Sequence, residues 1–239
     1  MFSKACEIVS QFTRPVFFPK TNNGETRYSG GTFVILNNEG WIITAAHLLD
    51  SMGKYDNDSQ SYWWGMDNTK VVDIIKSEAN DLAIGRLEPF DPSSINNSYP
   101  KFKNPTKIKP GTSLCNYGYI FNTVSVHENE EKNFKINFQS LVSSFSIEGI
   151  CSKTAIEHIN AKGKRCKFLE TSSPGVFGQS GGPIFDTKGT IWAIQSKTKC
   201  YLQRLCEPEI QNILVGWGVH PEVIIDFLYE NNIKFNVSN

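Results

Sequence analysis

The chain has 239 residues, and its 24 Lys and Arg residues balance its 24 Asp and Glu residues, so the formal net charge is zero. A chain of this length can bury a sizeable core without disulfides or metals. A zero net charge gives no general attraction to nucleic acid or to an anionic membrane, and neither is an expected partner. No apolar run approaches the ~18 residues of a membrane span. The sequence therefore predicts a soluble globular protein.

Residues 1–13 predict a short amphipathic helix. Ala5, Ile8 and Phe12 share one face at helical spacing. The stretch does not resemble a secretory signal, because Lys4 interrupts what would have to be an apolar run. We therefore expect a cytoplasmic location and reduced cysteines.

Short apolar runs alternate with turn residues between positions 14 and 88. Residues 30–36 and 41–46 are apolar and are separated by an Asn-Asn-Glu-Gly turn, which is the pattern of a β-hairpin. Further strands are expected at residues 14–18, 71–75 and 81–87. This part of the chain predicts a first β unit.

Residues 89–110 contain five prolines and read as an irregular connection between two units. Strands are expected again at residues 112–126, 134–145, 167–171, 183–186, 190–196 and 213–219. Pro221 precedes apolar residues at helical spacing, which predicts a terminal helix. We expect an N-terminal helix over residues 1–13, a first β-barrel over 14–88, a connection over 89–110, a second β-barrel over 111–219, and a helix and tail over 220–239.

The sharpest signal is the stretch GQSGGP at residues 178–183. Its five fixed positions arise by chance in roughly 3 of 10,000 chains of this length. A serine hydroxyl becomes a good nucleophile when a base removes its proton, and the resulting intermediate needs donors for its oxyanion. A tight glycine-flanked loop can direct the N–H groups of Gly178 and Ser180 towards one point. A glycine-rich turn without chemistry is the alternative.

Two other stretches offer a base and a group to orient it. His47 is the only one of the four histidines that directly follows an apolar strand. Asp81 opens the apolar run 81–87. Taken singly, His47 could be a packed or surface histidine and Asp81 a strand-end cap. Taken with a serine nucleophile, an aspartate can hold the imidazole in one tautomer and stabilise its charged form.

The stretches TAAH, DLAI and GQSGGP, in this order, resemble the chymotrypsin-like serine peptidases of trypsin fold, and in style the intracellular bacterial trypsin-like and HtrA-like proteases. The resemblance implies an all-β fold of two packed antiparallel six-stranded β-barrels, here with a short helix at each end. It implies a serine endopeptidase in which His47 is the general base, Asp81 the orienting carboxylate and Ser180 the nucleophile. Gly178 and Ser180 would form the oxyanion hole, and the chemistry would need no cofactor and no metal.

The same resemblance assigns residues to the substrate. Gln195, Ser196 and Lys197 fall where the family pairs its backbone with an extended peptide. Pro174 falls near the base of the pocket for the residue before the cleaved bond, and an uncharged residue there disfavours a demand for Arg or Lys. The expected partner is therefore a protein or peptide substrate.

Two departures from the family concern regulation. Many secreted relatives have Asp at the position of Gln179, where it binds an N-terminus released by zymogen cleavage. Gln179 cannot form that ion pair, and no IVGG-like activation site occurs near residue 14. HtrA-like proteins usually append a PDZ domain, for which this sequence ends too soon. These departures predict either a constitutively competent enzyme or one whose oxyanion loop is ordered by an activating or regulatory protein partner.

The competing hypothesis is a catalytically silent trypsin-fold protein that binds a peptide or a partner. Loss of a triad residue would favour it, and none is lost. The six cysteines form no CxxC pair, which argues against a zinc site. Cys200 and Cys206 could close a small disulfide loop, but a reduced insertion beside the substrate-binding strand agrees better with a cytoplasmic location.

Overall fold

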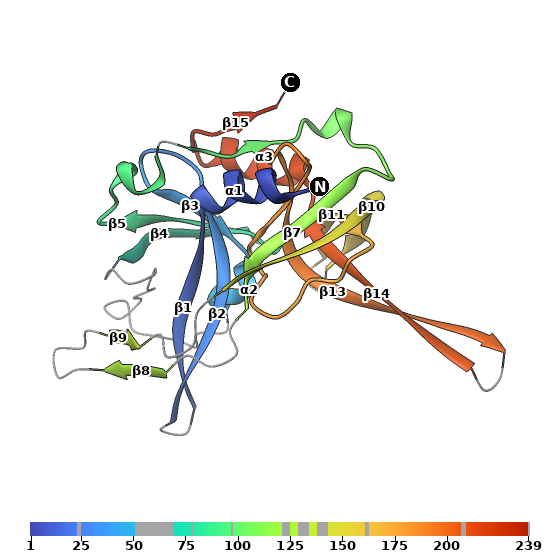
Figure 1. Cartoon of the computed structure of the whole chain (residues 1–239), viewed down its shortest axis with the longest axis horizontal. Coiled ribbons are helices and arrows are strands. Elements are labelled where there is room, and N and C mark those ends of the chain that lie inside the picture. The colour runs from blue at the N-terminus through green and yellow to red at the C-terminus, as the bar shows by residue number, and fades with distance from the viewer. Residues whose placement is uncertain are drawn as a thin grey trace.

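The fold is described from a computed structural model. It describes residues 1–22, 25–50, 69–77, 79–96, 98–120, 125–128, 134–137, 143–160, 163–206 and 209–238. Three α-helices are present in these ranges: α1 (Ser3–Phe12), α2 (Ala46–Asp50) and α3 (Pro221–Glu230). Two short 3-10 helices accompany them: η1 (Pro92–Ile95) and η2 (Pro105–Lys107). The rest of the described fold is mostly β-strand (Figure 1).

The first sheet contains five antiparallel strands in the order β1-β2-β3-β5-β4. Its strands are β1 (Thr13–Asn22), β2 (Glu25–Ile35), β3 (Trp41–Thr44), β4 (Lys70–Lys76) and β5 (Ala83–Glu88). The predicted hairpin is confirmed, because Val34 of β2 pairs with Ile43 of β3. Its turn is closed by Asn37 Oδ1, which accepts from the N–H of Glu39 at 3.0 Å. Gly40 follows at φ +80°, which glycine adopts without steric cost.

The second sheet contains eight strands in the order β12-β7-β10-β11-β14-β13-β6-β15. Its strands are β6 (Lys101–Phe102), β7 (Ser113–Tyr119), β10 (Ser144–Ile159), β11 (Arg165–Thr171), β12 (Pro183–Phe185), β13 (Ile191–Cys206), β14 (Glu209–Val219) and β15 (Asn236–Val237). An additional pairing of β12 with β13 closes six of these strands into a ring. Strands β8 (Ser125–Glu128) and β9 (Phe134–Asn137) form a separate pair.

The observed strands refine the sequence expectations. The second sheet contains the expected ring of six strands, whereas the described pairings of the first sheet leave β1 and β4 as edges. Two closed six-stranded barrels therefore remain a prediction, as does the division into domains. The expected strand at 134–145 is instead represented by β9 and by the start of β10. β13 and β14 continue beyond the expected strands as one long hairpin, which extends away from the rest of the fold in Figure 1.

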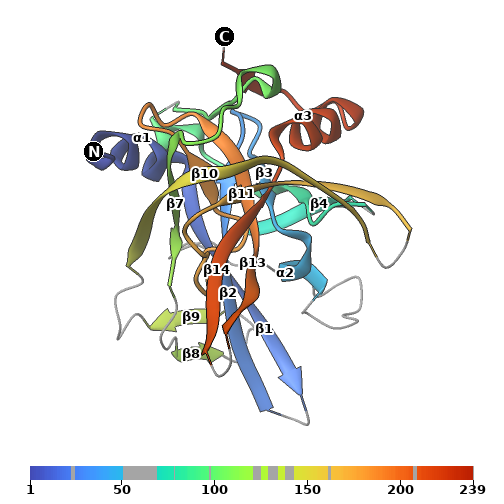
Figure 2. The ribbon, with the colours of Figure 1, turned by 90° about the vertical axis from the view of Figure 1, so that its right-hand side faces the viewer.

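The predicted terminal helices α1 and α3 lie at the same end of the molecule in both views (Figures 1 and 2). α1 buries Ala5, Val9 and Phe12, the face that the spacing indicated. α3 begins with Pro221, and the His220 ring nitrogen Nδ1 accepts from the N–H of Glu222 at 3.2 Å as an N-terminal cap. None of the helices in the described ranges is long and apolar enough to span a membrane.

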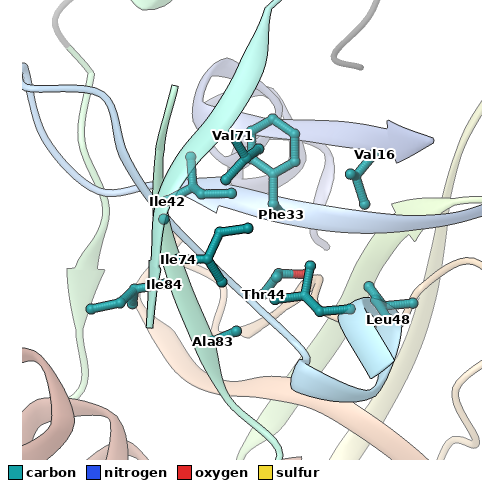
Figure 3. A pocket seen from close by; sticks show the side chains of 11 residues that line it. Val16, Phe33, Ile42, Thr44, Leu48, Val71, Ile74, Ala83 and Ile84 are labelled. Atoms are coloured by element: carbon teal, nitrogen blue, oxygen red, sulfur yellow. The ribbon is translucent and has the colours of Figure 1, made fainter. Parts of the chain in front are cut away.

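Apolar side chains fill the interior of the first sheet. Figure 3 shows a small cavity there, of about 10 Å³, enclosed by residues from β1, β2, β3, α2, β4 and β5. Phe33, Ile42 and Ile84 are almost fully buried around it. A space of this size is near the lower limit for one water molecule, and its walls offer few polar partners. The core beneath the site described next is therefore closely packed.

Candidate active site

His47 lies where a buried strand ends at the surface. β3 is followed by Ala45 and Ala46, both buried, and His47 then lies in the first turn of α2. Small residues allow this turn to pack tightly, while the His47 side chain is 45% exposed. The local sequence thus anchors the backbone in the core and leaves the imidazole accessible.

Asp81 holds His47 through two hydrogen bonds. Its Oδ2 lies 2.7 Å from His47 Nδ1, and its Oδ1 accepts from the His47 backbone N–H at 2.8 Å. The backbone bond fixes the rotation of the carboxylate, and the ring bond favours the tautomer with the proton on Nδ1. The neutral ring then has a lone pair on Nε2, which can accept a proton.

A third donor completes the surroundings of Asp81. The hydroxyl of Ser196, a buried residue of β13, donates to Asp81 Oδ2 at 2.6 Å. Burial disfavours the charged carboxylate and would raise the pKa of Asp81. The hydrogen bond and charge of His47, together with the hydrogen bond from Ser196, outweigh this effect and hold the pKa of Asp81 below its ordinary value. Asp81 is therefore ionised at neutral pH.

The loop around Ser180 consists of two successive tight turns. The N–H of Gln179 donates to Val176 O at 3.0 Å, and the N–H of Gly182 donates to Gln179 O at 2.8 Å. The third residue of each turn is a glycine with positive φ, Gly178 at +97° and Gly181 at +81°. This is the type II turn, which requires glycine at that position. The GQSGGP stretch therefore has a conformational explanation at both of these glycines.

The serine loop packs against the first sheet. The N–H of Thr32, in β2, donates to Ser180 O at 2.9 Å, and the Thr32 hydroxyl donates to Gly178 O at 2.8 Å. A Cβ on Gly181 would lie 2.1 Å from Thr32 O and 3.0 Å from the N–H nitrogen of Ala45. The absence of a side chain on Gly181 thus brings Ser180 beside the segment that carries His47.

Two backbone donors of this loop find no acceptor among the described residues. Within the described part of the chain, neither the N–H of Gly178 nor that of Ser180 donates a hydrogen bond. Most backbone N–H groups in folded proteins are paired, so two such donors beside a serine are available to an acceptor from a ligand. The arrangement can accept a proton at His47 Nε2 and stabilise an oxyanion next to Ser180.

Comparison with known proteins agrees with this geometry. Residues 31–194 match the sequence model of a family described as trypsin-like peptidase domain. The chain belongs to this family. No curated protein sequence matches at a significant level. The predicted resemblance to trypsin-fold serine peptidases is confirmed.

Solved structures of an HtrA-type protease have the same fold as this trypsin-like domain. A structure of the HtrA-type protease AlgW with a tripeptide has 15% sequence identity and a TM-score of 0.62, covering 98% of this chain and 65% of that one. A variant of AlgW, also with a tripeptide, has 14% identity and a TM-score of 0.63, covering 96% and 63%. The chain thus spans less than two thirds of the length of both AlgW chains. At these identities the likeness shows the fold.

Gln179 holds the serine loop through hydrogen bonds of its side-chain amide. Its side chain is fully buried, with Oε1 accepting from the N–H of Val176 at 3.1 Å and Nε2 donating to Phe145 O at 3.1 Å. Phe145 lies near the start of β10, which pairs with β7. The buried side chain of Gln179 thereby links the serine loop to β10 of the second sheet.

The predicted substrate-binding residues lie beside the serine loop. The N–H of Gly181 donates to Gln195 O and the N–H of Gln195 donates to Gly182 O, each at 2.8 Å. The Gln195 side chain is buried, and a Cβ on Gly175 would lie 2.3 Å from its Nε2. Pro174, next to Gly175, is half-buried. The structure therefore brings the segment at Pro174 and the start of β13 together.

Three residues of the site escaped the sequence analysis. Thr198 donates from its hydroxyl to Gly175 O at 2.7 Å, joining β13 to the loop before Ser180. Asn116 is buried and its Nδ2 donates to Gln195 Oε1 at 3.4 Å. Thr32 links the serine loop to β2. Thr32 follows two glycines at the start of an apolar run, which is a usable signal, whereas nothing in the local sequence of Asn116 indicates its contact. Among the described residues, no group of three or more His, Cys, Asp or Glu could hold a metal ion.

Proposed function

We propose that this protein is a serine endopeptidase that hydrolyses peptide bonds through Ser180, His47 and Asp81. The observation that supports it most is the carboxylate of Asp81, which binds the ring and the backbone of His47. Beside it, the serine loop has two N–H groups that donate to no residue in the described part of the chain. Membership of the trypsin-like peptidase family supports the same reaction class.

In the first half-reaction, His47 Nε2 takes the proton of Ser180 Oγ as the oxygen attacks the substrate carbonyl carbon. The N–H groups of Gly178 and Ser180 stabilise the negative charge that develops on the carbonyl oxygen. Asp81 stabilises the imidazolium through the bond to Nδ1. The imidazolium then donates its proton to the leaving amine, which gives an acyl-enzyme on Ser180. Water, activated by His47, hydrolyses the ester.

The substrate is an extended peptide that pairs with β13. From Ser196 onward, β13 pairs only with β14 among the described strands, so its other edge is open. A peptide that adds to this edge gains main-chain hydrogen bonds to the segment formed by Gln195, Ser196 and Lys197. The similar AlgW structures contain a tripeptide, which supports a peptide as the class of ligand.

The side chain of the residue before the cleaved bond enters the space between Pro174 and β13. The buried Gln195 amide and the Thr198 hydroxyl face the segment at Gly175 from the other side. None of these groups is a carboxylate, so an uncharged side chain is favoured over Arg and Lys.

The decisive experiment is covalent labelling with a fluorophosphonate probe, read by intact mass. The wild-type protein should gain one adduct, and Ser180→Ala and His47→Ala should gain none, with all three shown to be folded by circular dichroism. An unlabelled, folded wild-type protein would contradict constitutive activity. Labelling that appears only after addition of a candidate partner would then identify a regulated enzyme. Continued absence would leave the catalytically silent peptide-binding protein. A cytoplasmic location and regulation by a partner remain predictions.

A further inference from the structure

Two lysines of β13 lie over aromatic rings on one face of the second sheet. The Nζ of Lys197 is 4.3 Å from the ring centroid of Phe168 and 5.3 Å from that of Trp217. The Nζ of Lys199 is 5.1 Å from the Trp217 centroid. His158 of β10 stacks on Phe168 at 5.4 Å. These five residues are here called the lysine platform.

A buried carboxylate on this face is engaged by other groups. Glu170 is buried, and its Oε2 accepts from the hydroxyl of Tyr201 at 2.7 Å and from Trp217 Nε1 at 3.1 Å. The ammonium of Lys153 lies 3.2 Å from Glu170 Oε1. The charge of Glu170 is therefore balanced by Lys153 and does not neutralise the platform.

The platform itself carries unbalanced positive charge. Within the described ranges, neither Lys197 nor Lys199 forms an ion pair with a carboxylate. The charge of Asp81 acts on Lys197, so two ammonium groups face a single carboxylate. Burial first, and then the neighbouring charge of Lys199, lowers the pKa of Lys197. His158 Nδ1 is buried without a hydrogen-bond partner. The two ammonium groups repel each other, and a negatively charged group of a ligand would reduce this repulsion.

The register of a peptide on β13 determines which of its side chains reach the platform. In an antiparallel pair, directly opposite residues project to the same face. The residue before the cleaved bond lies opposite Ser196, because Ser196 contacts Asp81 and its neighbour Gln195 is bonded to the serine loop. The second residue before the cleaved bond is then opposite Lys197, and the fourth is opposite Lys199.

We propose that the lysine platform selects acidic side chains at the second and fourth positions before the cleaved bond. The inference rests on the proposed peptidase function and names its substrate class, an extended peptide with Asp or Glu at these alternate positions. A carboxylate at either position comes within reach of an ammonium group when the lysine side chain turns from the Phe168 and Trp217 rings, which belong to β11 and β14, towards the open edge of β13. The same sites disfavour Lys and Arg by charge repulsion.

The test uses fluorogenic tetrapeptide amides whose C-terminal residue carries the coumarin leaving group. The first and third positions are equimolar mixtures, and the second and fourth are fixed as Glu, Gln or Lys. We expect the Glu pools to be cleaved about fivefold faster than the Gln pools, which is the scale of a partly exposed ion pair, and the Lys pools more slowly than either. Lys197→Met should abolish the preference at the second position, and Lys199→Met the preference at the fourth. Lys188→Met, an exposed lysine of the β12–β13 turn, is the matched control and should retain both.

Binding separates this inference from the catalytic proposal. Ser180→Ala should bind the fluorescein-labelled Glu peptides more tightly than the Gln peptides in fluorescence anisotropy, with a difference that shrinks as salt is added. Fluorophosphonate labelling of the wild type without any preference for Glu would overturn the platform and leave the peptidase proposal intact. Preferential binding of Glu peptides to a protein that is never labelled would overturn the peptidase proposal and leave an acidic-peptide-binding surface. Equal binding of Glu and Gln peptides would contradict the selection of acidic side chains by the lysine platform, whether or not the protein is labelled.

Discussion

At the scale of single residues, Ser196 connects the two sheets at the proposed catalytic carboxylate. It comes from β13 of the second sheet, whereas Asp81 lies two residues before the start of β5 in the first sheet. The hydroxyl of Ser196 is one of the groups that lower the pKa of Asp81 against the opposing effect of burial. Ser196 does not touch the reacting atoms, so it acts by positioning the carboxylate.

Ser196→Ala should lower kcat/KM about tenfold, the scale expected for one hydrogen bond to a charged group. Without this donor, the pKa of Asp81 rises towards its ordinary value. A lowered folded-state pKa contributes stability that is present above the unfolded-state pKa of Asp81 and is lost as pH falls through the folded-state value. The variant should therefore have less of this stability at neutral pH, and its loss should be complete at a higher pH than in the wild type. Both effects are measured by kcat/KM and by thermal unfolding from neutral pH down to about pH 3.

The control for this substitution is Ser93→Ala. Ser93 donates to Asp91 Oδ2 at 2.7 Å in the exposed η1 segment, so it loses the same type of bond away from the site. This variant should keep wild-type kcat/KM. Identical pH profiles for Ser196→Ala and the wild type would show that the hydroxyl does not tune Asp81.

At the scale of elements, the sequence predicted the segments that contain the proposed catalytic residues better than the strands and contacts that support these segments. His47 follows two small residues at the start of α2, and Ser180 lies between glycines that occupy type II turns. In both motifs the residues themselves determine the local geometry. β10 was not predicted as a long strand, because its residues are mainly polar and exposed. The contact between Gln179 and Phe145 O was not predictable, because every residue has a backbone carbonyl and the identity of Phe145 therefore does not indicate the contact.

The link between the serine loop and β10 predicts a specific effect of Gln179→Ala. This change leaves the N–H of Val176 and the carbonyl of Phe145 without their partner, and each lost bond costs about 1 kcal/mol. The loop should then sample conformations in which the N–H groups of Gly178 and Ser180 diverge. We expect the rate of fluorophosphonate labelling to fall about tenfold. Labelling kinetics by intact mass measure this directly.

Two further variants test the interpretation of Gln179. Gln179→Glu retains an acceptor for Val176 but cannot donate to Phe145 O when ionised, so its labelling rate should also fall. Asn231→Ala removes a similar amide bond, from Nδ2 to Phe227 O at 2.8 Å, at the end of α3 and should label as the wild type does. Wild-type labelling by Gln179→Ala would mean that the loop holds its shape without this bridge.

At the scale of the whole molecule, the two sheets meet around Thr32. This buried residue of β2 donates from its hydroxyl to Gly178 O at 2.8 Å, and the same oxygen accepts from the N–H of Tyr119 at the end of β7 at 3.2 Å. Its carbonyl accepts from the hydroxyl of Thr44 at 2.7 Å, beside the segment that leads to His47. One side chain thus ties the first sheet, the second sheet and the serine loop to each other.

Thr32→Val keeps the shape of the side chain and removes both hydroxyl bonds, so it should lower the free energy of unfolding by about 2–4 kcal/mol. Thr13→Val is a closely matched comparison, because Thr13 is equally buried in the first sheet but its hydroxyl oxygen has no hydrogen-bond partner among the residues that the structure describes. Replacing that unpaired hydroxyl with a methyl group should leave stability unchanged or raise it by about 1 kcal/mol. Urea denaturation of both variants measures the difference. Equal losses of stability in the two variants would mean that the Thr32 hydroxyl does not join the sheets. A loss for Thr32→Val without a loss for Thr13→Val would show that the Thr32 hydroxyl oxygen links the two sheets and the serine loop.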